Sequence, residues 1–299
     1  MTDIVTIAAA AYPLDWFDDF DAFAAKAARW VAEAVGQGAD LLVFPEYGAM
    51  ELASLGGAAV AADPEGALSE VARHRPAMDA VFARLAAEHG VHILGPSGPV
   101  FTGNRPVNRA TLFGPKGVIG HQDKQIMTRF EREEWDVVPG EDGLAVFETA
   151  LGRLGVVICY DSEFPLLSRA LTEAGVEILL APSCTETLAG FTRVRVGSMA
   201  RALENQCAVV HAPLVGNAEW CAAVEEATGR ASIYGPPDRD WPATGILAEG
   251  AMNGTGWVTA QVSRAQIAQT RADGVVLNVR HWPEQAARLA QAPRIVTAS

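Results

Sequence analysis

The chain has 299 residues, a net charge of −13 at pH 7 and an apolar fraction of 49%. The length suits one large α/β domain or two smaller ones, and the apolar content together with only 20% charged residues excludes a disordered chain. Because an acidic surface repels phosphate backbones, we expect no nucleic-acid partner.

The N-terminal segment MTDIVTIAAAAYPLDW has no basic region before its apolar run, so it predicts a first strand and not a signal peptide. No window holds the roughly 18 uncharged apolar residues that a membrane helix needs. The four cysteines lack C-x-x-C spacing, and the missing signal favours free thiols in a reducing compartment. We therefore expect a cytoplasmic protein with no membrane contact and no metal site.

Apolar patterning predicts strands and helices that alternate along the chain. Continuous apolar runs predict buried strands, and apolar residues at helical spacing before a glycine predict helices. The predicted strands are 3–11, 39–46, 91–98, 108–115, 117–124, a hairpin over 143–160, 176–183, 207–216, 229–235, 244–249 and 255–262. The predicted helices are 20–38, 76–90, 166–175, 194–206 and 263–271.

No linker, composition break or repeat divides the chain, so we predict a single α/β domain over 1–271 and a less regular C-terminal tail over 272–299. The mixture of short turns and long crossovers predicts two mixed β-sheets with helices on their outer faces. The sequence has no G-x-G-x-x-G after its first strand and no G-x-x-x-x-G-K-[ST]. Dinucleotide and triphosphate binding therefore have no support from these motifs.

Three of the predicted strands end in a polar or reactive group. LLVFPE ends at Glu46, GVIGHQDK ends at Lys124, and GVVIC ends at Cys159. Taken singly, the first two are typical of solvated loop charges and the cysteine of a core residue. Taken together, at the strand ends where α/β proteins place their chemistry, they supply a base, a cation and a nucleophile.

This set of groups suits attack on an amide-type carbon. Glu46 would take the thiol proton of Cys159, and Lys124 with the backbone N–H of Tyr160 would stabilise the oxyanion. Glu46 would then protonate the departing amine and activate the water that hydrolyses the thioester. Asp161 or Ser162 is a candidate cap for the following helix, whose N-terminus would lower the thiol pKa.

The segments FPEYG, HQDKQIMTRFEREEW and GVVICYDSEFP resemble the three signature segments of the nitrilase superfamily, the carbon–nitrogen hydrolases, in the same order and at similar separations. The resemblance also includes 193–212 and 229–237, and covers roughly residues 4–262. It implies a four-layer αββα sandwich, a Glu46–Lys124–Cys159 triad, no metal or organic cofactor, and homo-oligomers built on a dimer. It also suggests that the tail crosses to a neighbouring subunit.

Many members of this superfamily carry a second glutamate that positions the lysine. The loop FEREEWDVVPG offers Glu131, Glu133 and Glu134, and the E-x-W spacing of the resemblance favours Glu133. Four further residues beside the strand ends are candidates for the pocket wall: Tyr47, Trp135, Cys184 and Thr185.

The favoured function is thiol-dependent hydrolysis of a small linear amide or carbamoyl-amine. CYDSEFP resembles amidase branches, whereas nitrile-cleaving members typically carry Trp-Glu after the cysteine, so nitrile hydrolysis stays an alternative, as does acyl transfer. A papain-like pair of Cys159 with His211 would leave Glu46 and Lys124 unexplained. A non-catalytic binding protein of the same fold is the rival outside the enzymes.

Overall fold

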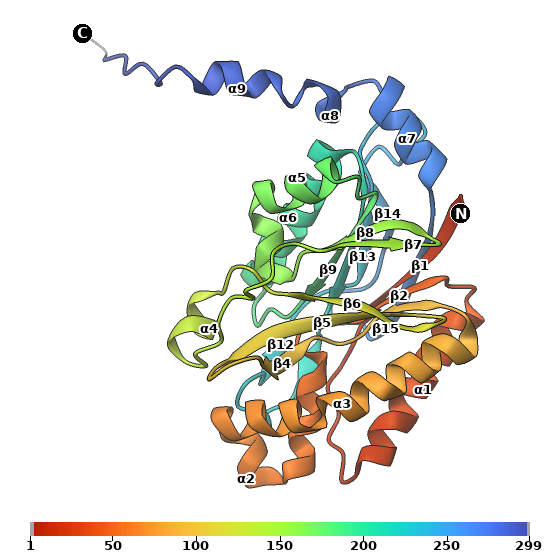
Figure 1. Ribbon diagram of the computed structural model, residues 1–299, viewed down its shortest axis with the longest axis vertical. Coiled ribbons are helices and arrows are strands. Elements are labelled where there is room, and N and C mark those ends of the chain that lie inside the picture. Colours follow the sequence, from red (N-terminus) through yellow and green to blue (C-terminus); the bar gives the residue numbers. More distant parts are fainter. Residues whose placement is uncertain (1–2, 298–299) are drawn as a thin grey trace.

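Two β-sheets are stacked face to face, and helices cover their outer faces, in the computed structural model, which describes residues 3–297 (Figure 1). The four-layer αββα sandwich expected from the sequence is confirmed. Residues 1–2 and 298–299, at the ends of the predicted domain and tail, lie outside the described residues. Among residues 3–297, no helix combines the length and apolar content that crossing a bilayer requires.

The first sheet has the order β15-β1-β2-β3-β5-β4, with β6 beside β5, and the second has the order β14-β13-β10-β9-β8-β7. The strands of the first sheet are β1 (Ile4–Ala11), β2 (Leu41–Val43), β3 (His92–Leu94), β4 (Gly98–Phe101), β5 (Pro106–Gly114), β6 (Gly117–Asp123) and β15 (Gly256–Ser263). Those of the second are β7 (Val146–Thr149), β8 (Gly152–Val156), β9 (Ile178–Ser183), β10 (Ala208–Pro213), β13 (Ser232–Tyr234) and β14 (Ile246–Glu249). A small ribbon pairs β11 (Gly216–Asn217) with β12 (Glu226–Ala227).

The helices differ in where they pack. The first sheet is covered by α1 (Phe20–Gly36), the 3₁₀ helix η1 (Gly48–Gly56), α2 (Ala58–Ala61) and α3 (Pro64–His89), and the second by α5 (Pro165–Glu173) and α6 (Leu188–Asn205). Two short elements follow strand ends: α4 (Arg129–Glu133) and the 3₁₀ helix η2 (Cys159–Glu163). The C-terminal part contains α7 (Arg264–Asp273), α8 (Asn278–His281) and α9 (Glu284–Leu289).

Successive side chains of a strand point to opposite faces of its sheet, so alternate residues enter different apolar layers of the sandwich. On β1, Ile7 packs between the two sheets, whereas Ala8 packs under the helices of the first sheet. On β9, Leu180 packs between the sheets and Leu179 packs under α5 and α6. Strands buried on both faces need apolar residues at every position, which is why they read as unbroken apolar runs.

Prolines explain where the observed elements differ from the predicted ones. Pro45 has no N–H for the sheet, and β2 ends before it, so Glu46 lies in a loop instead of ending a strand. Pro96 lies in the gap where the predicted strand 91–98 divides into β3 and β4. Pro76 does not begin its helix but lies inside α3, which begins at Pro64 with Asp63 as its N-cap.

The carboxyl ends of the central strands gather at one end of the sandwich. Strands β1, β2 and β3 are parallel to one another, as are β8, β9 and β10. A parallel bridge between Tyr12 and Leu214 joins the two sheets just beyond β1 and β10. The loops after β2, β6, β8 and β9 therefore meet at this end, which places their side chains around one site.

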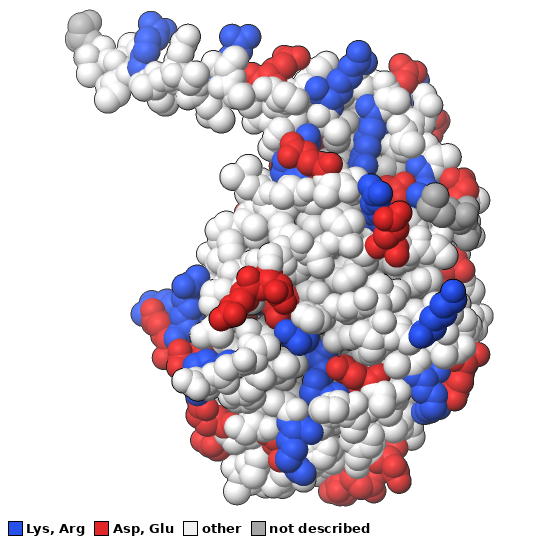
Figure 2. Space-filling view, in the orientation of Figure 1, with Lys and Arg blue, Asp and Glu red and all other residues white. Residues whose placement is uncertain are grey.

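Over residues 272–297, the contacts of the tail with the body lie in its first part. The side chain of Gln206 bonds to the backbone of Val276 and Val279, and Arg169 lies 4.6 Å from the centre of the Trp282 ring. Beyond this ring, α9 and residues 290–297 run away from the sandwich as a projection that a broad hollow separates from the body (Figures 1 and 2). Leu289, Ile295 and Val296 are 81%, 93% and 82% exposed.

We predict that this projection packs on a second copy of the chain, because each large apolar side chain gains about 1.5–3 kcal/mol on burial. Full-length protein should then be a dimer or larger by light scattering, and a chain that ends at Pro283, which keeps the contacts of Trp282, should have a smaller mass. A full-length monomer, or an unchanged oligomer after truncation, would contradict this prediction.

Candidate active site

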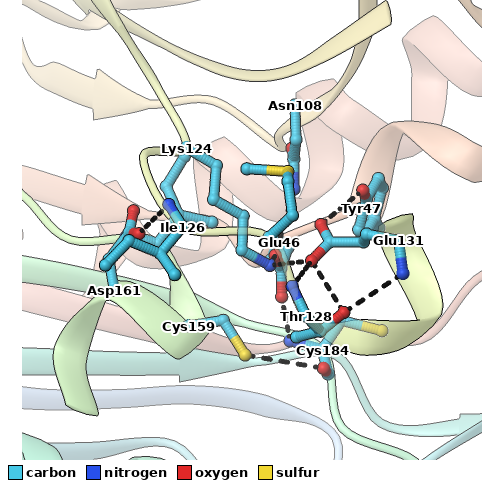
Figure 3. Close-up of polar contacts among 12 residues, drawn as sticks. Glu46, Tyr47, Asn108, Lys124, Ile126, Thr128, Glu131, Cys159, Asp161 and Cys184 are labelled. Carbon is cyan, nitrogen blue, oxygen red and sulfur yellow. Dashed lines mark hydrogen bonds and ion pairs between the residues drawn. The ribbon is translucent and has the colours of Figure 1, made fainter. Parts of the chain in front are cut away.

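A buried lysine held between two carboxylates forms the centre of the site. Lys124 follows β6, and its Nζ lies 2.7 Å from Glu46 Oε1 and 2.7 Å from Glu131 Oε2 (Figure 3). All three side chains are almost completely buried. Since an unpaired charge costs several kcal/mol in such an environment, the lysine and the carboxylates hold one another in place.

Glu46 is fixed through both of its oxygens. Oε1 also accepts a hydrogen bond from Asn108 Nδ2 at 3.0 Å, and Oε2 accepts one from the backbone N–H of Cys184 at 2.9 Å. Asn108 is oriented in turn by Ser97, whose Oγ donates to Asn108 Oδ1 at 2.7 Å. The sequence analysis missed Asn108, although a buried polar residue within an apolar strand was the available signal.

Cys159 lies on a strained turn at the start of η2. Its φ of 49° is in the left-handed region, as is the φ of 54° at Tyr47, which directly follows Glu46. Non-glycine residues rarely adopt this conformation, and such strain concentrates at functional sites. Cys159 Sγ faces the carbonyl oxygen of Cys184 at 3.6 Å, so the turn directs the thiol towards the loop after β9 (Figure 3).

The structure shows that Glu131, and not the predicted Glu133, is the second glutamate beside Lys124. Glu133 is exposed and pairs with Arg129 at 2.7 Å, whereas Glu131 contacts the lysine. Glu131 also accepts hydrogen bonds from Tyr47 Oη at 2.8 Å and from Thr128, the N-cap of α4. The T-x-x-E capping box formed by Thr128 and Glu131 was the sequence signal that would have identified it.

The three charges shift one another's pKa values. Burial raises the pKa of Glu46 to about 7, and the charge of Glu131 adds to the rise while Lys124 opposes it. Burial alone would lower the pKa of Lys124, but the two carboxylates hold this pKa well above its usual range. Burial would raise the pKa of Glu131, yet Lys124 and the surrounding donors hold it below its usual range. Glu131 and Lys124 thus form an ion pair whose charges cancel, and Glu46 can exchange a proton near neutral pH.

The pKa of the Cys159 thiol is raised, whereas the sequence analysis expected a helix N-terminus to lower it. Burial and the neighbouring Glu46 carboxylate raise the pKa of Cys159 well above its usual value. Asp161 and Ser162 do not cap α5, whose N-cap is Phe164. Resting Cys159 is therefore a neutral thiol whose proton needs an acceptor during attack, and Glu46 is the carboxylate beside it.

A cavity of about 210 Å³ opens beside these groups. Its lining includes the three residues of the predicted triad, Glu131, and the backbone-donor candidate Tyr160. It also includes all four residues expected in the pocket wall: Tyr47, Trp135, Cys184 and Thr185. The ring centres of Trp135 and Tyr47 are 5.1 Å apart, so the tryptophan supports the tyrosine that bonds to Glu131.

His211 is not part of this site. It is fully buried beneath Phe191, its Nε2 lies 2.8 Å from Ser183 Oγ, and burial lowers its pKa to about 3. It is outside the cavity lining, so the papain-like alternative has no geometric support.

The outer wall of the cavity is mainly acidic. Glu163, Glu186 and Glu226 line it together with Arg193, which is the one guanidinium of the described lining and lies 3.4 Å from Glu163. A neighbouring hollow shares Glu186 and Glu226 and adds Glu134 and Glu225.

Comparison with known proteins identifies the family of the chain. The profile of the carbon-nitrogen hydrolase family matches residues 6–272. The chain belongs to the carbon-nitrogen hydrolase family. This result confirms the resemblance stated from the three sequence segments.

Two curated relatives and one solved structure show the range of similarity. "Probable hydrolase YhcX" of Bacillus subtilis is 31% identical over 92% of this chain, which spans only about half (53%) of that protein. An omega-amidase of Danio rerio is 27% identical over 71% of this chain and 74% of its own length. The crystal structure of an amidase from Nesterenkonia sp. has a TM-score of 0.67 and 25% identity, and the match covers 93% of this chain and 96% of that one.

A variant structure of the Nesterenkonia amidase contains acrylamide joined by Michael addition to its active-site cysteine. This variant is 24% identical, with a TM-score of 0.65, and the match covers 94% of this chain and 98% of that one.

We predict that Glu131→Gln lowers kcat by about 10- to 100-fold, because it frees Lys124 from one of its two buried partners. It should also move the acid limb of the kcat/KM profile to lower pH, since removal of the Glu131 charge lowers the pKa of Glu46. The measurement is a pH–rate profile of both proteins. Glu133→Gln is the matched control and should leave kcat and the profile unchanged; the reverse pattern would restore Glu133 as the supporting residue.

We expect kcat/KM of the unmodified protein to rise with pH through about 7 and to level off above it. Glu46 has a raised pKa and must be ionised to accept the thiol proton, so activity is lost as the pH falls through this value. A profile that stays flat from pH 5 to 8 would exclude Glu46 as the base.

Proposed function

We propose that the protein hydrolyses a small linear amide or carbamoyl-amine through a thioester on Cys159. The observation that carries the proposal is the contact of Lys124 with Glu46 and Glu131 in the cavity wall that also presents Cys159. Base, cation and nucleophile face one space, as nucleophilic attack on a carbonyl requires. The cysteine adduct of the Nesterenkonia amidase supports the same role for this thiol.

In the first half-reaction, Glu46 accepts the thiol proton as Cys159 Sγ forms a bond to the carbonyl carbon. The carbonyl π electrons move onto oxygen, where Lys124 and the N–H of Tyr160 stabilise the charge. Glu46 then passes the proton to the substrate nitrogen, the C–N bond breaks, and ammonia or an amine leaves. The acyl group remains on Cys159 as a thioester.

In the second half-reaction, water loses a proton to Glu46 and its oxygen attacks the thioester carbon. The tetrahedral oxyanion collapses, the C–S bond breaks, and the sulfur recovers its proton from Glu46. The products are a carboxylic or carbamic acid and the free thiol, so the protein returns to its starting state.

Cysteine replacement gives the first test. Cys159→Ala should abolish turnover of every substrate, whereas Cys207→Ala, which changes a buried cysteine outside the cavity, should retain kcat. Release of ammonia from a panel of small amides, carbamoyl-amines and nitriles is the measurement. Turnover by Cys159→Ala at the unmodified rate would overturn the mechanism, and turnover of nitriles alone would favour the alternative reaction.

The charges of the outer wall lead to a prediction about the substrate. The outer wall carries three carboxylates and one guanidinium, so it should attract cations. A cationic amide such as 4-aminobutyramide should therefore have a lower KM than neutral butyramide, and the anionic amide succinamate should have the highest KM of the three. The differences should shrink in high salt. The opposite order, lost in Arg193→Ala, would instead assign Arg193 as a carboxylate-binding residue.

Acyl transfer uses the same thioester with another nucleophile. Added hydroxylamine should divert part of the thioester to a hydroxamate, and the rate of ammonia release should stay coupled to acid formation in its absence. Turnover only when an acyl acceptor is present would favour a transferase. A binding protein would show no ammonia release at all and no labelling of Cys159 by iodoacetamide, a reagent that carries an amide group.

A further inference from the structure

We propose that Asp161 is a positioning residue that sets the separation between the nucleophile and the lysine, by joining the loop after β8 to the loop after β6. This proposal rests on the reaction proposed above. It assigns a role to a buried carboxylate that the catalytic steps do not use.

The contacts of Asp161 connect two segments that are distant in sequence. Oδ1 accepts hydrogen bonds from the backbone N–H of Ile126 at 2.8 Å and of Gln125 at 3.3 Å. Oδ2 accepts from Gln125 at 3.2 Å and from the N–H of Ile158 at 3.3 Å (Figure 3 shows the contact with Ile126). One carboxylate therefore bonds the two residues after Lys124 and the residue before Cys159.

These two segments come from different sheets. Gln125 and Ile126 continue from β6 in the first sheet, and Ile158 continues from β8 in the second. The carboxylate therefore joins the two halves of the sandwich at the point where the lysine and the thiol must meet. A shift between the halves would change the distance from Lys124 to the carbon that Cys159 attacks.

Only an ionised carboxylate fits this position. Asp161 is 1% exposed, and its hydrogen-bond partners are all backbone N–H groups, which donate and cannot accept. Burial raises the pKa of Asp161 to about 6, against the lowering effects of Lys124 and of these donors, so the carboxyl group is ionised at pH 8. An amide in its place would turn an NH₂ donor towards at least one N–H.

The same residue supports the strained turn of the nucleophile. The backbone N–H of Asp161 donates to Ile158 O at 2.9 Å, and Ser162 Oγ donates to Cys159 O at 2.6 Å. These bonds enclose Cys159 while it holds its left-handed φ of 49°. The side chain and the backbone of Asp161 thus fix the turn and its distance from Lys124 together.

The separation between Cys159 and Lys124 matters more for stabilising the transition state than for binding the substrate. Asp161 is not part of the described cavity lining, and its side chain bonds to none of the lining residues, whereas oxyanion stabilisation depends on where Lys124 lies relative to the attacked carbon. A misplacement of about 1 Å can cost about 100-fold in rate. Loss of the Asp161 contacts should therefore reduce kcat and leave KM nearly unchanged.

The test compares Asp161→Asn with Glu51→Gln at pH 8. Glu51 is also a fully buried carboxylate, but it bonds to Lys26 and Tyr12 and does not line the cavity. Asp161→Asn should lower kcat by about 10- to 100-fold with KM within about threefold. Glu51→Gln should lower the melting temperature and leave kcat unchanged.

Labelling of Cys159 by iodoacetamide provides a second measurement that needs no turnover. Asp161→Asn should change the labelling rate, and Glu51→Gln should not. An Asp161→Asn protein with unmodified kcat and labelling rate, or one whose losses match those of Glu51→Gln, would overturn the positioning role. If the unmodified protein released no ammonia from any amide, the proposed function would fail, while the labelling rates would still decide whether Asp161 positions the thiol.

Discussion

The pairing of Lys124 with two buried carboxylates is the interaction on which the site depends. One lysine cannot neutralise both glutamates, so the cluster is left with one negative charge unless a proton binds. Glu131, with Tyr47 and Thr128 as additional donors, keeps its charge. The proton that relieves the excess charge therefore binds to Glu46, and burial raises the pKa of this carboxyl group, ordinarily a weak acid that is fully ionised at pH 7, to about 7.

This cluster requires that the two sheets be held in a fixed relation. Glu46 and Lys124 come from the first sheet, whereas Cys159 and the N–H of Cys184 come from the second. The parallel bridge between Tyr12 and Leu214 and the packed layer between the sheets fix this relation over most of the sandwich. The site is thus a product of sheet packing, although each of its residues is supplied by a short loop.

Much of this arrangement could be predicted from the sequence, because strands predicted just before Glu46, Lys124 and Cys159 indicate the direction of the chain, and the apolar runs before Glu46 and Cys159 also indicate burial. The sequence showed which glutamate turns inward only through the T-x-x-E capping box of Thr128 and Glu131, because this cap sets the orientation of the short helix α4. The E-x-W spacing favoured Glu133, which faces solvent. The state of the thiol was out of reach, because its pKa depends on burial by residues far along the chain.

The buried neutral thiol has a consequence for the resistance of the protein to oxidation and alkylation. Peroxide and most electrophiles react with the thiolate, and oxidation beyond the sulfenic acid is irreversible for most proteins. A cysteine that keeps its proton is slow to react with these agents. Under the proposed mechanism, the raised pKa of Cys159 therefore limits such damage, because the sulfur would lose its proton only to Glu46 during attack on a carbonyl carbon.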